Sequence, residues 1–243
     1  MEEHIQGEAP LTLRVIARIH SDFPTKFGIP RQSGLAPSQQ AVIQFEPAYR
    51  DDNALRGLED YSHLWLIWGF SEVKQARWSP MVKPPRLGGN TRMGVFATRS
   101  PFRPNPIGLS SVRLVGMERK PGCGTLLHVS GGDLMDGTPI YDIKPYLSFT
   151  DSHPDARNGF AGPHSGEKLT VSMDGDWLNQ IAPEKRAGLV EALAQDPRPA
   201  YQEDPETAYG FAYAEFDVRF RVRDGVVQVF EMAPLSDAIR KIK

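Results

Sequence analysis

Short runs of apolar and β-branched residues, separated by turns rich in glycine and proline, follow one another through the first 145 residues. Leu11–Ile19 alternates apolar and polar residues over most of its length, as a half-buried strand does. His63–Phe70 is a continuous apolar run with several aromatics, which is typical of a core strand. Further strands are predicted at 41–45, 92–98, 109–115, 125–130 and 140–144. Many short strands and one short helix, expected at 51–60, indicate a barrel or a sandwich.

The pattern of residues along the chain changes after a polar, Pro- and Gly-rich segment at 151–166. This segment resembles a linker. A strand is predicted at 169–173, and a helix is expected to begin at Pro183. Phe216–Phe230 predicts a hairpin, because Asp224-Gly225 separates two alternating runs. We therefore expect two domains, a mainly β domain over 1–160 and a small α+β domain over 166–243.

Composition narrows the class of protein. The chain is 40% hydrophobic and 24% charged, as an ordinary globular protein is. It has no apolar run near the ~20 residues that a membrane span needs, and no apolar signal core near its beginning. The single cysteine, Cys123, excludes an intramolecular disulfide and a Cys-rich zinc site. We expect a cytoplasmic protein with neither a membrane nor a metal as partner.

One stretch is basic although the net charge is only −2. No Asp or Glu occurs from Val73 to Met117. The basic residues of this stretch are Lys74, Arg77, Lys83, Arg86, Arg92, Arg99, Arg103 and Arg113. Such a stretch attracts phosphate or carboxylate groups. The alternative is that these side chains pair with acids from other parts of the chain.

The loop Ala97–Gly108 lies within this stretch and is stiffened by Pro101, Pro104 and Pro106. A stiff loop loses little entropy when it binds a ligand, so it can hold Arg99, Arg103 and Asn105 in fixed positions. These three side chains are candidates for ligand contact. The alternative is a structural corner between two strands.

A second candidate segment is Asp133–Tyr146, in which acids cluster around the turn Asp136-Gly137. Asp142 and Lys144 share one strand face, so they could form a plain salt bridge or part of a pocket rim. The chain has no Gly-x-Gly-x-x-Gly after a strand, no phosphate-binding loop, no Gly-x-Ser-x-Gly and no His-Glu-x-x-His. A Rossmann-type cofactor site is therefore disfavoured.

Arg219, Arg221 and Arg223 alternate in the predicted hairpin and share one strand face. Three guanidinium groups on one face suit a phosphate backbone. The alternative is a solvated face on which they pair with Asp217 or neighbouring glutamates.

Six motifs in order resemble the TrmO (YaeB-like, TsaA-domain) family across about residues 11–160. They are Phe27–Gln32, Leu58–Trp65, Pro84–Gly89, Met93–Ser100, Arg103–Gly108 and Asp133–Tyr146. The C-terminal part is similar, more loosely, to the extra domain of the long bacterial members.

This resemblance implies a specific function. Members use S-adenosylmethionine to methylate N6 of threonylcarbamoyl-adenosine beside the tRNA anticodon, at position 37. The implied N-terminal domain is an antiparallel β-barrel, unlike most methyltransferases, and members are homodimers with the cofactor near the subunit interface. By motif, cofactor contact falls on Pro30, Arg31, Gln32, His63, Leu64, Arg99, Leu109, Asp133, Leu134, Met135 and Asp136.

The chemistry suggests further roles. N6 of the implied substrate is bonded to a carbonyl, so it is a poor nucleophile until its proton leaves, and a general base is expected. Asp133, Asp142 and Lys144 are the candidates. Substrate contacts are expected at Arg103, Asn105, Tyr146 and the hairpin arginines, with Arg103 or Lys144 facing the threonyl carboxylate. A non-catalytic nucleotide- or RNA-binding module, or a methyltransferase for another carbamoylated substrate, are the alternatives.

Overall fold

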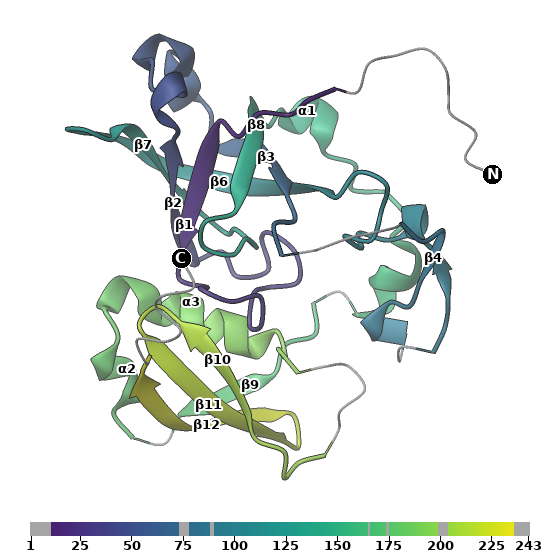
Figure 1. Cartoon of the computed structure of the whole chain (residues 1–243). Helices are drawn as coiled ribbons and strands as arrows, with labels where there is room; N and C mark the ends of the chain where they lie inside the picture. The colour runs from purple at the N-terminus through teal and green to yellow at the C-terminus, as the bar shows by residue number, and fades with distance from the viewer. Residues whose placement is uncertain are drawn as a thin grey trace.

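The computed structural model describes residues 11–72, 78–87, 90–164, 166–173, 175–198 and 204–235, and it contains a closed antiparallel barrel (Figure 1). The barrel order is β1-β2-β7-β6-β3-β8. Its strands are β1 (Ala17–Ser21), β2 (Gln40–Phe45), β3 (His63–Gly69), β6 (Ile107–Lys120), β7 (Gly124–Ser130) and β8 (Pro139–Pro145). The predicted mainly β architecture is thus confirmed, as a barrel.

Alternation along each strand fills the barrel. In β3, Leu64, Leu66 and Trp68 are buried, while the residues between them are more exposed. The buried side chains of the other strands, such as Ile19 and Ile43, join them in one apolar cluster. Burial of such side chains is the main stabilising contribution to a barrel of this kind.

Several predicted elements differ from the structure. The helix expected at 51–60 is two short 3-10 helices, η2 (Asp52–Leu55) and η3 (Leu58–Asp60), separated by Gly57 with φ 86°. A left-handed residue cannot continue a helix. Of the strand expected at 92–98, only β5 (Met93–Gly94) forms, paired with β4 (Met81–Val82). The remaining short elements are η1 (Pro47–Tyr49), η4 (Pro85–Leu87) and η5 (Val95–Ala97).

The C-terminal part contains a four-stranded sheet of order β10-β11-β12-β9. The strands are β9 (Thr170–Met173), β10 (Tyr209–Tyr213), β11 (Phe216–Arg223) and β12 (Val226–Pro234), and β9 runs parallel to β12. The helices of this half of the chain are α1 (Ser148–Asp151), η6 (Gly159–His164), α2 (Trp177–Gln180) and α3 (Pro183–Ala194). The predicted hairpin is confirmed, with Asp224 and Gly225 both at positive φ. The domain boundary near 160–166 stays a prediction.

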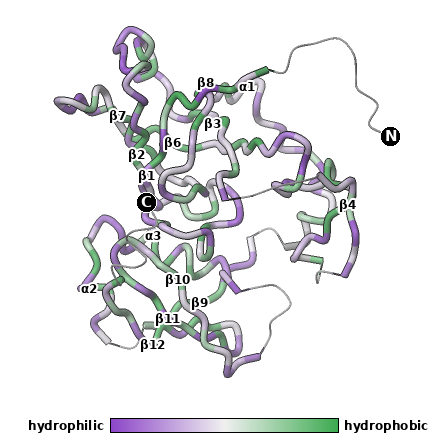
Figure 2. The backbone as a smooth tube through the Cα atoms, viewed as in Figure 1, coloured by the Kyte–Doolittle hydropathy of each residue, from purple (hydrophilic) through white to green (hydrophobic). Residues whose placement is uncertain are grey.

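Helix α3 lies between this sheet and the barrel (Figure 1). Its Leu189 and Leu193 are fully buried in a second apolar cluster with the strands of the C-terminal sheet. Figure 2 shows hydrophobic stretches along strands of both sheets, with hydrophilic residues concentrated in the connections. No helix in the described part of the chain is long and apolar enough to cross a membrane.

The connection between β1 and β2, residues 22–39, leaves the barrel and packs against the apolar cluster of the C-terminal sheet. Phe23 is fully buried in the C-terminal cluster, 5.4 Å from the ring of Tyr213 between centroids. Phe27 and Ile29 pack against the same cluster. We call residues 22–39 the bridging loop, because it joins the two cores.

Candidate functional site

Asp133 lies just after β7 in a hydrogen-bonded network that begins inside the barrel. Trp68 Nε1 donates to Ser110 Oγ at 2.9 Å, and Ser110 Oγ donates to Asp133 Oδ1 at 2.6 Å. The backbone N–H of Ser33, in the bridging loop, also donates to the Asp133 carboxylate. Two separate segments therefore bond this carboxylate directly, and Trp68 of β3 orients the hydroxyl group of one of them.

The electrostatics of Asp133 are set by burial. Loss of water raises the pKa of its carboxyl above the ordinary 3.8, although the bonds from Ser110 and Ser33 and the charge of Arg99 oppose the rise. Desolvation is the largest of these effects. A carboxylate with a raised pKa is a stronger proton acceptor than an exposed one, which suits a general base.

Arg99 meets the bridging loop beside this network. Its Nη1 donates a hydrogen bond to Oε1 of Gln32. The structure thus brings together Gln32, Arg99 and Asp133, three residues predicted for the cofactor site from widely separated motifs.

The other arginine of the loop Ala97–Gly108, Arg103, forms hydrogen bonds within the loop itself. Arg103 Nη1 donates to the carbonyl oxygen of Thr98 at 3.2 Å, and its backbone N–H donates to that of Pro101 at 2.9 Å. Arg103 therefore contributes to the stiff corner itself, while Asn105 is exposed. The predicted substrate contacts of both residues stay predictions.

A cleft of about 480 Å³ lies on the barrel wall next to the network. It is lined by Ser33, Gly34, Pro37, Ser62, His63, Ser111, Arg113, Ser130 and Gly131. The backbone N–H of Ser111 donates to Ser33 Oγ at 3.2 Å, and that of Gly34 donates to the Gly131 carbonyl at 2.8 Å. Gly34 and Gly131 have φ of 80° and 77°, which allows the two backbones to approach closely.

His63 opens β3 at the rim of this cleft. Its Nδ1 lies 2.9 Å from Ser62 Oγ, and its ring centroid lies 6.1 Å from that of Tyr146. The histidine is exposed, so it can contact a bound molecule. Tyr146 also lies 5.4 Å from Trp65 between ring centroids.

The other predicted cofactor residues occupy varied positions. Leu64 is fully buried in the barrel core and Leu134 is nearly so, which leaves only their backbones for contact. Leu109, by contrast, is 55% exposed. Pro30 is buried and Met135 is partly buried.

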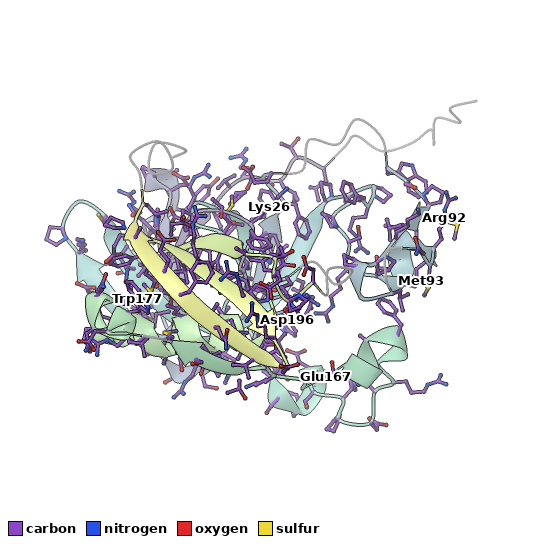
Figure 3. The ribbon with its side chains drawn as sticks, turned by 90° about the horizontal axis from the view of Figure 1, so that it is seen from below. Lys26, Arg92, Met93, Glu167, Trp177 and Asp196 are labelled. Carbon is purple, nitrogen blue, oxygen red and sulfur yellow. The ribbon has the colours of Figure 1, made fainter. Side chains whose placement is uncertain are left out.

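Arg31 and Asp136 have structural partners. Arg31 Nη2 donates to the carbonyl oxygens of Asp196 and Arg198 at 3.0 and 3.1 Å, beyond the C-terminal end of α3 (Asp196 is labelled in Figure 3). Asp136 Oδ1 lies 3.2 Å from His20 Nδ1, and it accepts a hydrogen bond from the backbone N–H of Ser21 at 3.3 Å.

Asp142 and Lys144 form the plain salt bridge that their spacing allows, with Nζ and Oδ2 3.0 Å apart. Asp142 in β8 and Leu109 in β6 both pair with Ile67 of β3, which lies between them. All three residues occupy outward-facing positions of the barrel wall. No described hydrogen bond or ion pair joins Asp142 or Lys144 to Asp133. The acids expected to form one rim therefore do not form one hydrogen-bonded cluster.

The hairpin arginines share one face of β11, as predicted, but each has a neighbour. Arg219 Nε lies 3.1 Å from Asp217 Oδ2, and Arg223 Nη2 lies 2.6 Å from Glu206 Oε1. The guanidinium carbon of Arg221 lies 4.6 Å from the centroid of the Phe230 ring. The alternative of a solvated, acid-paired face thus accounts for much of this arrangement.

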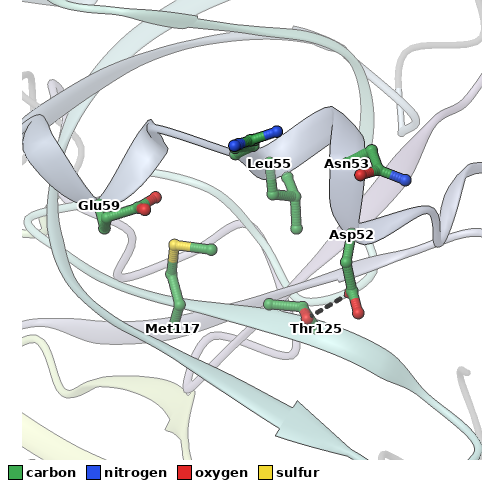
Figure 4. Close-up of a pocket in the computed structure, with 7 residues that line it drawn as sticks. Asp52, Asn53, Leu55, Glu59, Met117 and Thr125 are labelled. Carbon is green, nitrogen blue, oxygen red and sulfur yellow. Dashed lines mark hydrogen bonds between the residues drawn. The ribbon is translucent and has the colours of Figure 1, made fainter.

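Of the basic stretch, Lys74 and Arg77 lie outside the described residues. Arg92 lies at the edge of the molecule, directly before β5 (Figure 3). A second cleft of about 420 Å³ lies between η2 and the β6–β7 hairpin, with Asp52 accepting a 2.7 Å hydrogen bond from Thr125 (Figure 4). It contains none of the predicted site residues.

Sequence reasoning missed Ser33, Ser110 and Ser111, because isolated serines carry no motif. One signal was available for Ser110. It alternates with Leu109 on a barrel strand, and a hydroxyl at an inward position needs a hydrogen-bond partner. Nothing in the local sequence of Ser33 indicates its contact with Asp133.

Two family models match the chain in order. The tRNA-methyltransferase O N-terminal domain matches residues 18–152, and the TrmO C-terminal domain matches residues 170–235. The chain belongs to the TrmO family. Among the described residues, no group of three or more His, Cys, Asp or Glu side chains could hold a metal ion.

Relatives cover most of the chain. A tRNA (adenine(37)-N6)-methyltransferase of Escherichia coli (strain K12) is 42% identical over 230 residues, which are 90% of this chain and 96% of that protein. One from Eikenella corrodens is 45% identical and covers 70% of this chain and 95% of that protein. A crystal structure of TrmO from Pseudomonas aeruginosa has a TM-score of 0.73 and 34% identity, over 93% of this chain and 100% of that one.

Proposed function

We propose that this protein is an S-adenosylmethionine-dependent tRNA methyltransferase that acts on N6 of adenosine 37, in the form of threonylcarbamoyl-adenosine. The observation that carries the proposal is the ordered family match over residues 18–152 and 170–235. Two relatives that are 42% and 45% identical to the chain are named tRNA (adenine(37)-N6)-methyltransferases. The meeting of Gln32, Arg99 and Asp133 supports one shared site for the motifs.

The residues of this site fit the cofactor. A cleft of about 480 Å³ is within the usual ~300–1,000 Å³ range for small-molecule sites, and it is lined by small residues together with His63, one of the residues proposed for cofactor contact. The Asp133 carboxylate can accept hydrogen bonds from ribose hydroxyls, and Arg99 can face a carboxylate. The residues proposed to hold it are Pro30, Arg31, Gln32, His63, Leu64, Arg99, Leu109 and Asp133–Asp136. When bound, S-adenosylmethionine supplies an electrophilic methyl group.

The chain's own groups prepare the substrate. Asp133 is the strongest of the three candidates for the base, because burial raises its pKa and Ser110 and Ser33 hold its carboxylate still. Asp142 and Lys144 neutralise each other in their salt bridge, which makes each of them a weaker candidate for the general base. An arginine guanidinium group close to the carbamoyl oxygen of the substrate stabilises the negative charge that develops on that oxygen. Arg103, Asn105 and Tyr146 remain proposed substrate contacts.

The deciding experiment is mass spectrometry of tRNA nucleosides from a strain that lacks the gene, complemented with wild type or with Arg99→Ala. We expect methylated threonylcarbamoyl-adenosine with wild type only. A non-catalytic binding module would restore none, and a methyltransferase for another substrate would leave the nucleoside unmethylated. Equilibrium dialysis with labelled S-adenosylmethionine separates these two outcomes.

We also propose a cytoplasmic homodimer with the domains 1–160 and 166–243. Exposed apolar side chains support a second copy as the partner of the segment around the loop Ala97–Gly108. Phe96, Phe102, Ile107 and Leu109 are each more than a third exposed. Sedimentation of wild type and Leu109→Glu tests this proposal, because a charge in a subunit interface dissociates it.

A further inference from the structure

We infer that the C-terminal unit, α3 with the sheet β10-β11-β12-β9, is a clamp that positions the bridging loop for cofactor binding. This inference rests on the proposed function. It assigns the C-terminal unit a role in the methyl-donor site, separate from any contact with tRNA, and it makes Glu191 a positioning residue.

The bridging loop needs an external support. Residues 22–39 connect β1 to β2 without regular secondary structure, and a connection of this length is ordinarily mobile. Yet its centre carries Gln32 and Ser33, which bond Arg99, Ser111 and Asp133. Those contacts require that the loop be held in one conformation.

The first anchor is at the beginning of the loop. Lys185 Nζ, from α3, lies 2.8 Å from Asp22 Oδ1, and the backbone N–H of Ala214 donates to the Asp22 carbonyl at 2.7 Å. The next residue, Phe23, is fully buried against Tyr213. An ion pair, a backbone bond and an aromatic side chain thus fix this end.

The second anchor is Gly28, which lies directly on Phe211 of β10. A Cβ atom at this position would come within 2.2 Å of the Phe211 ring, and φ of 91° also favours glycine. On either side, Phe27 and Ile29 pack against the C-terminal cluster. The backbone therefore approaches the sheet as closely as sterics allow, three residues before Arg31.

The third anchor holds the end of the loop to α3. The Glu191 carboxylate accepts from both the backbone N–H and Oγ of Ser38, at 2.8 and 2.9 Å. Tyr213 Oη, on a fully buried ring, donates to Gln39 Oε1 at 3.1 Å. Gln195 Nε2 donates to the Leu35 carbonyl at 3.2 Å.

The anchors therefore flank the functional centre on both sides. Gln32 and Ser33 lie between Arg31, bonded to carbonyls beyond α3, and Leu35, bonded to Gln195. Releasing an anchor adds conformational freedom that cofactor binding must then remove. The affinity for S-adenosylmethionine should fall, while the chemical step at saturating cofactor and the affinity for tRNA should not.

Glu191 gives the sharpest test, because it lies on α3 and outside the proposed cofactor and substrate contacts. In Glu191→Ala we expect the Kd and KM for S-adenosylmethionine to rise about tenfold, as the loss of charge-assisted hydrogen bonds predicts. The kcat and the tRNA Kd should stay within about twofold of wild type. Glu191→Gln, which keeps one acceptor for the Ser38 N–H, should recover most of the affinity. Glu184→Ala, which removes an exposed carboxylate of the same helix, is the matched control.

Hydrogen exchange of residues 30–34 in the free protein provides a readout that needs neither cofactor nor activity. We expect faster exchange in Glu191→Ala than in wild type and in Glu184→Ala. Ser38→Ala, which loses only the hydroxyl bond, should show a smaller change of the same kind. Two results for Glu191→Ala would overturn the clamp. One is that hydrogen exchange and cofactor affinity both stay unchanged, and the other is that cofactor affinity, kcat and tRNA affinity all fall equally. If exchange responds but wild type shows no methylation, the proposed function fails and the clamp stands.

Discussion

The hydroxyl group of Ser110 donates a 2.6 Å hydrogen bond to Oδ1 of Asp133. The Ser110 hydroxyl oxygen itself accepts the indole N–H of Trp68 at 2.9 Å, so the direction of the Ser110 proton is fixed. A core residue of the barrel is in this way connected, through one hydroxyl, to the carboxylate at the proposed site. The orientation of Asp133 depends on the barrel interior as well as on the bridging loop.

Replacing Ser110 with alanine should change both the unfolding free energy of the protein and the pKa of Asp133. The Trp68 N–H would lose its acceptor inside the protein, which costs about 1–3 kcal/mol of unfolding free energy. The pKa of Asp133 should rise further, because the Ser110 bond lowers it. Urea denaturation measures the first effect, and the acidic limb of the activity profile, shifted to higher pH, measures the second. Ser111→Ala, which leaves this network intact, is the matched control, and equal acidic limbs in Ser110→Ala and Ser111→Ala would contradict the prediction.

Asp133→Asn should reduce kcat by at least about 100-fold if Asp133 is the base. It should also change how stability depends on pH. Burial raises the carboxyl pKa in the folded protein above 3.8, so between the two values the folded state binds more protons than the unfolded state. The unfolding free energy of wild type minus that of the variant should therefore fall as pH rises through this window, and level off above the raised pKa. Denaturation of both proteins at a series of pH values measures it, and a difference that rises with pH contradicts the assignment.

Much of the fold was predictable because apolar runs, strand alternation and turn residues are local patterns. The core run at His63–Phe70 and the Asp224-Gly225 turn were identified from neighbouring residues alone. The bridging loop was not, because its conformation depends on Phe23 entering a core formed more than 150 residues later. The parallel pairing of β9 with β12 likewise depends on packing between distant segments.

The candidate site was predictable only where a motif marks it. Arg99, Gln32 and Asp133 came from the family resemblance, and the structure brings them together. The extended spacing of Asp142 and Lys144 predicted their shared face and salt bridge correctly, yet spacing could not give their place relative to Asp133. That relation depends on the closure of the barrel.

Gly28→Ala should destabilise the protein more than an ordinary change at a left-handed glycine. The added methyl group meets the Phe211 ring and adds overpacking, about 1–3 kcal/mol, to the conformational cost of about 1 kcal/mol. Gly57→Ala is the matched control, because Gly57 has φ of 86° but nothing within 4 Å of an added Cβ. Thermal and urea denaturation of both variants measure the difference, and equal losses would show that Phe211 moves away without cost.

Replacing Arg219, Arg221 and Arg223 together with alanine tests the proposed tRNA contact of β11. Each lost phosphate contact should reduce the slope of log Kd against log salt concentration by about 0.7–0.9. We expect a reduction smaller than three such contacts give, because Asp217 and Glu206 already compensate Arg219 and Arg223. The control is a double alanine variant at Arg119 and Lys120, on the β6–β7 hairpin that projects from the barrel away from this sheet (Figure 1). A slope equal to that of wild type would remove the hairpin arginines from the tRNA interface and leave the C-terminal unit with its positioning role alone.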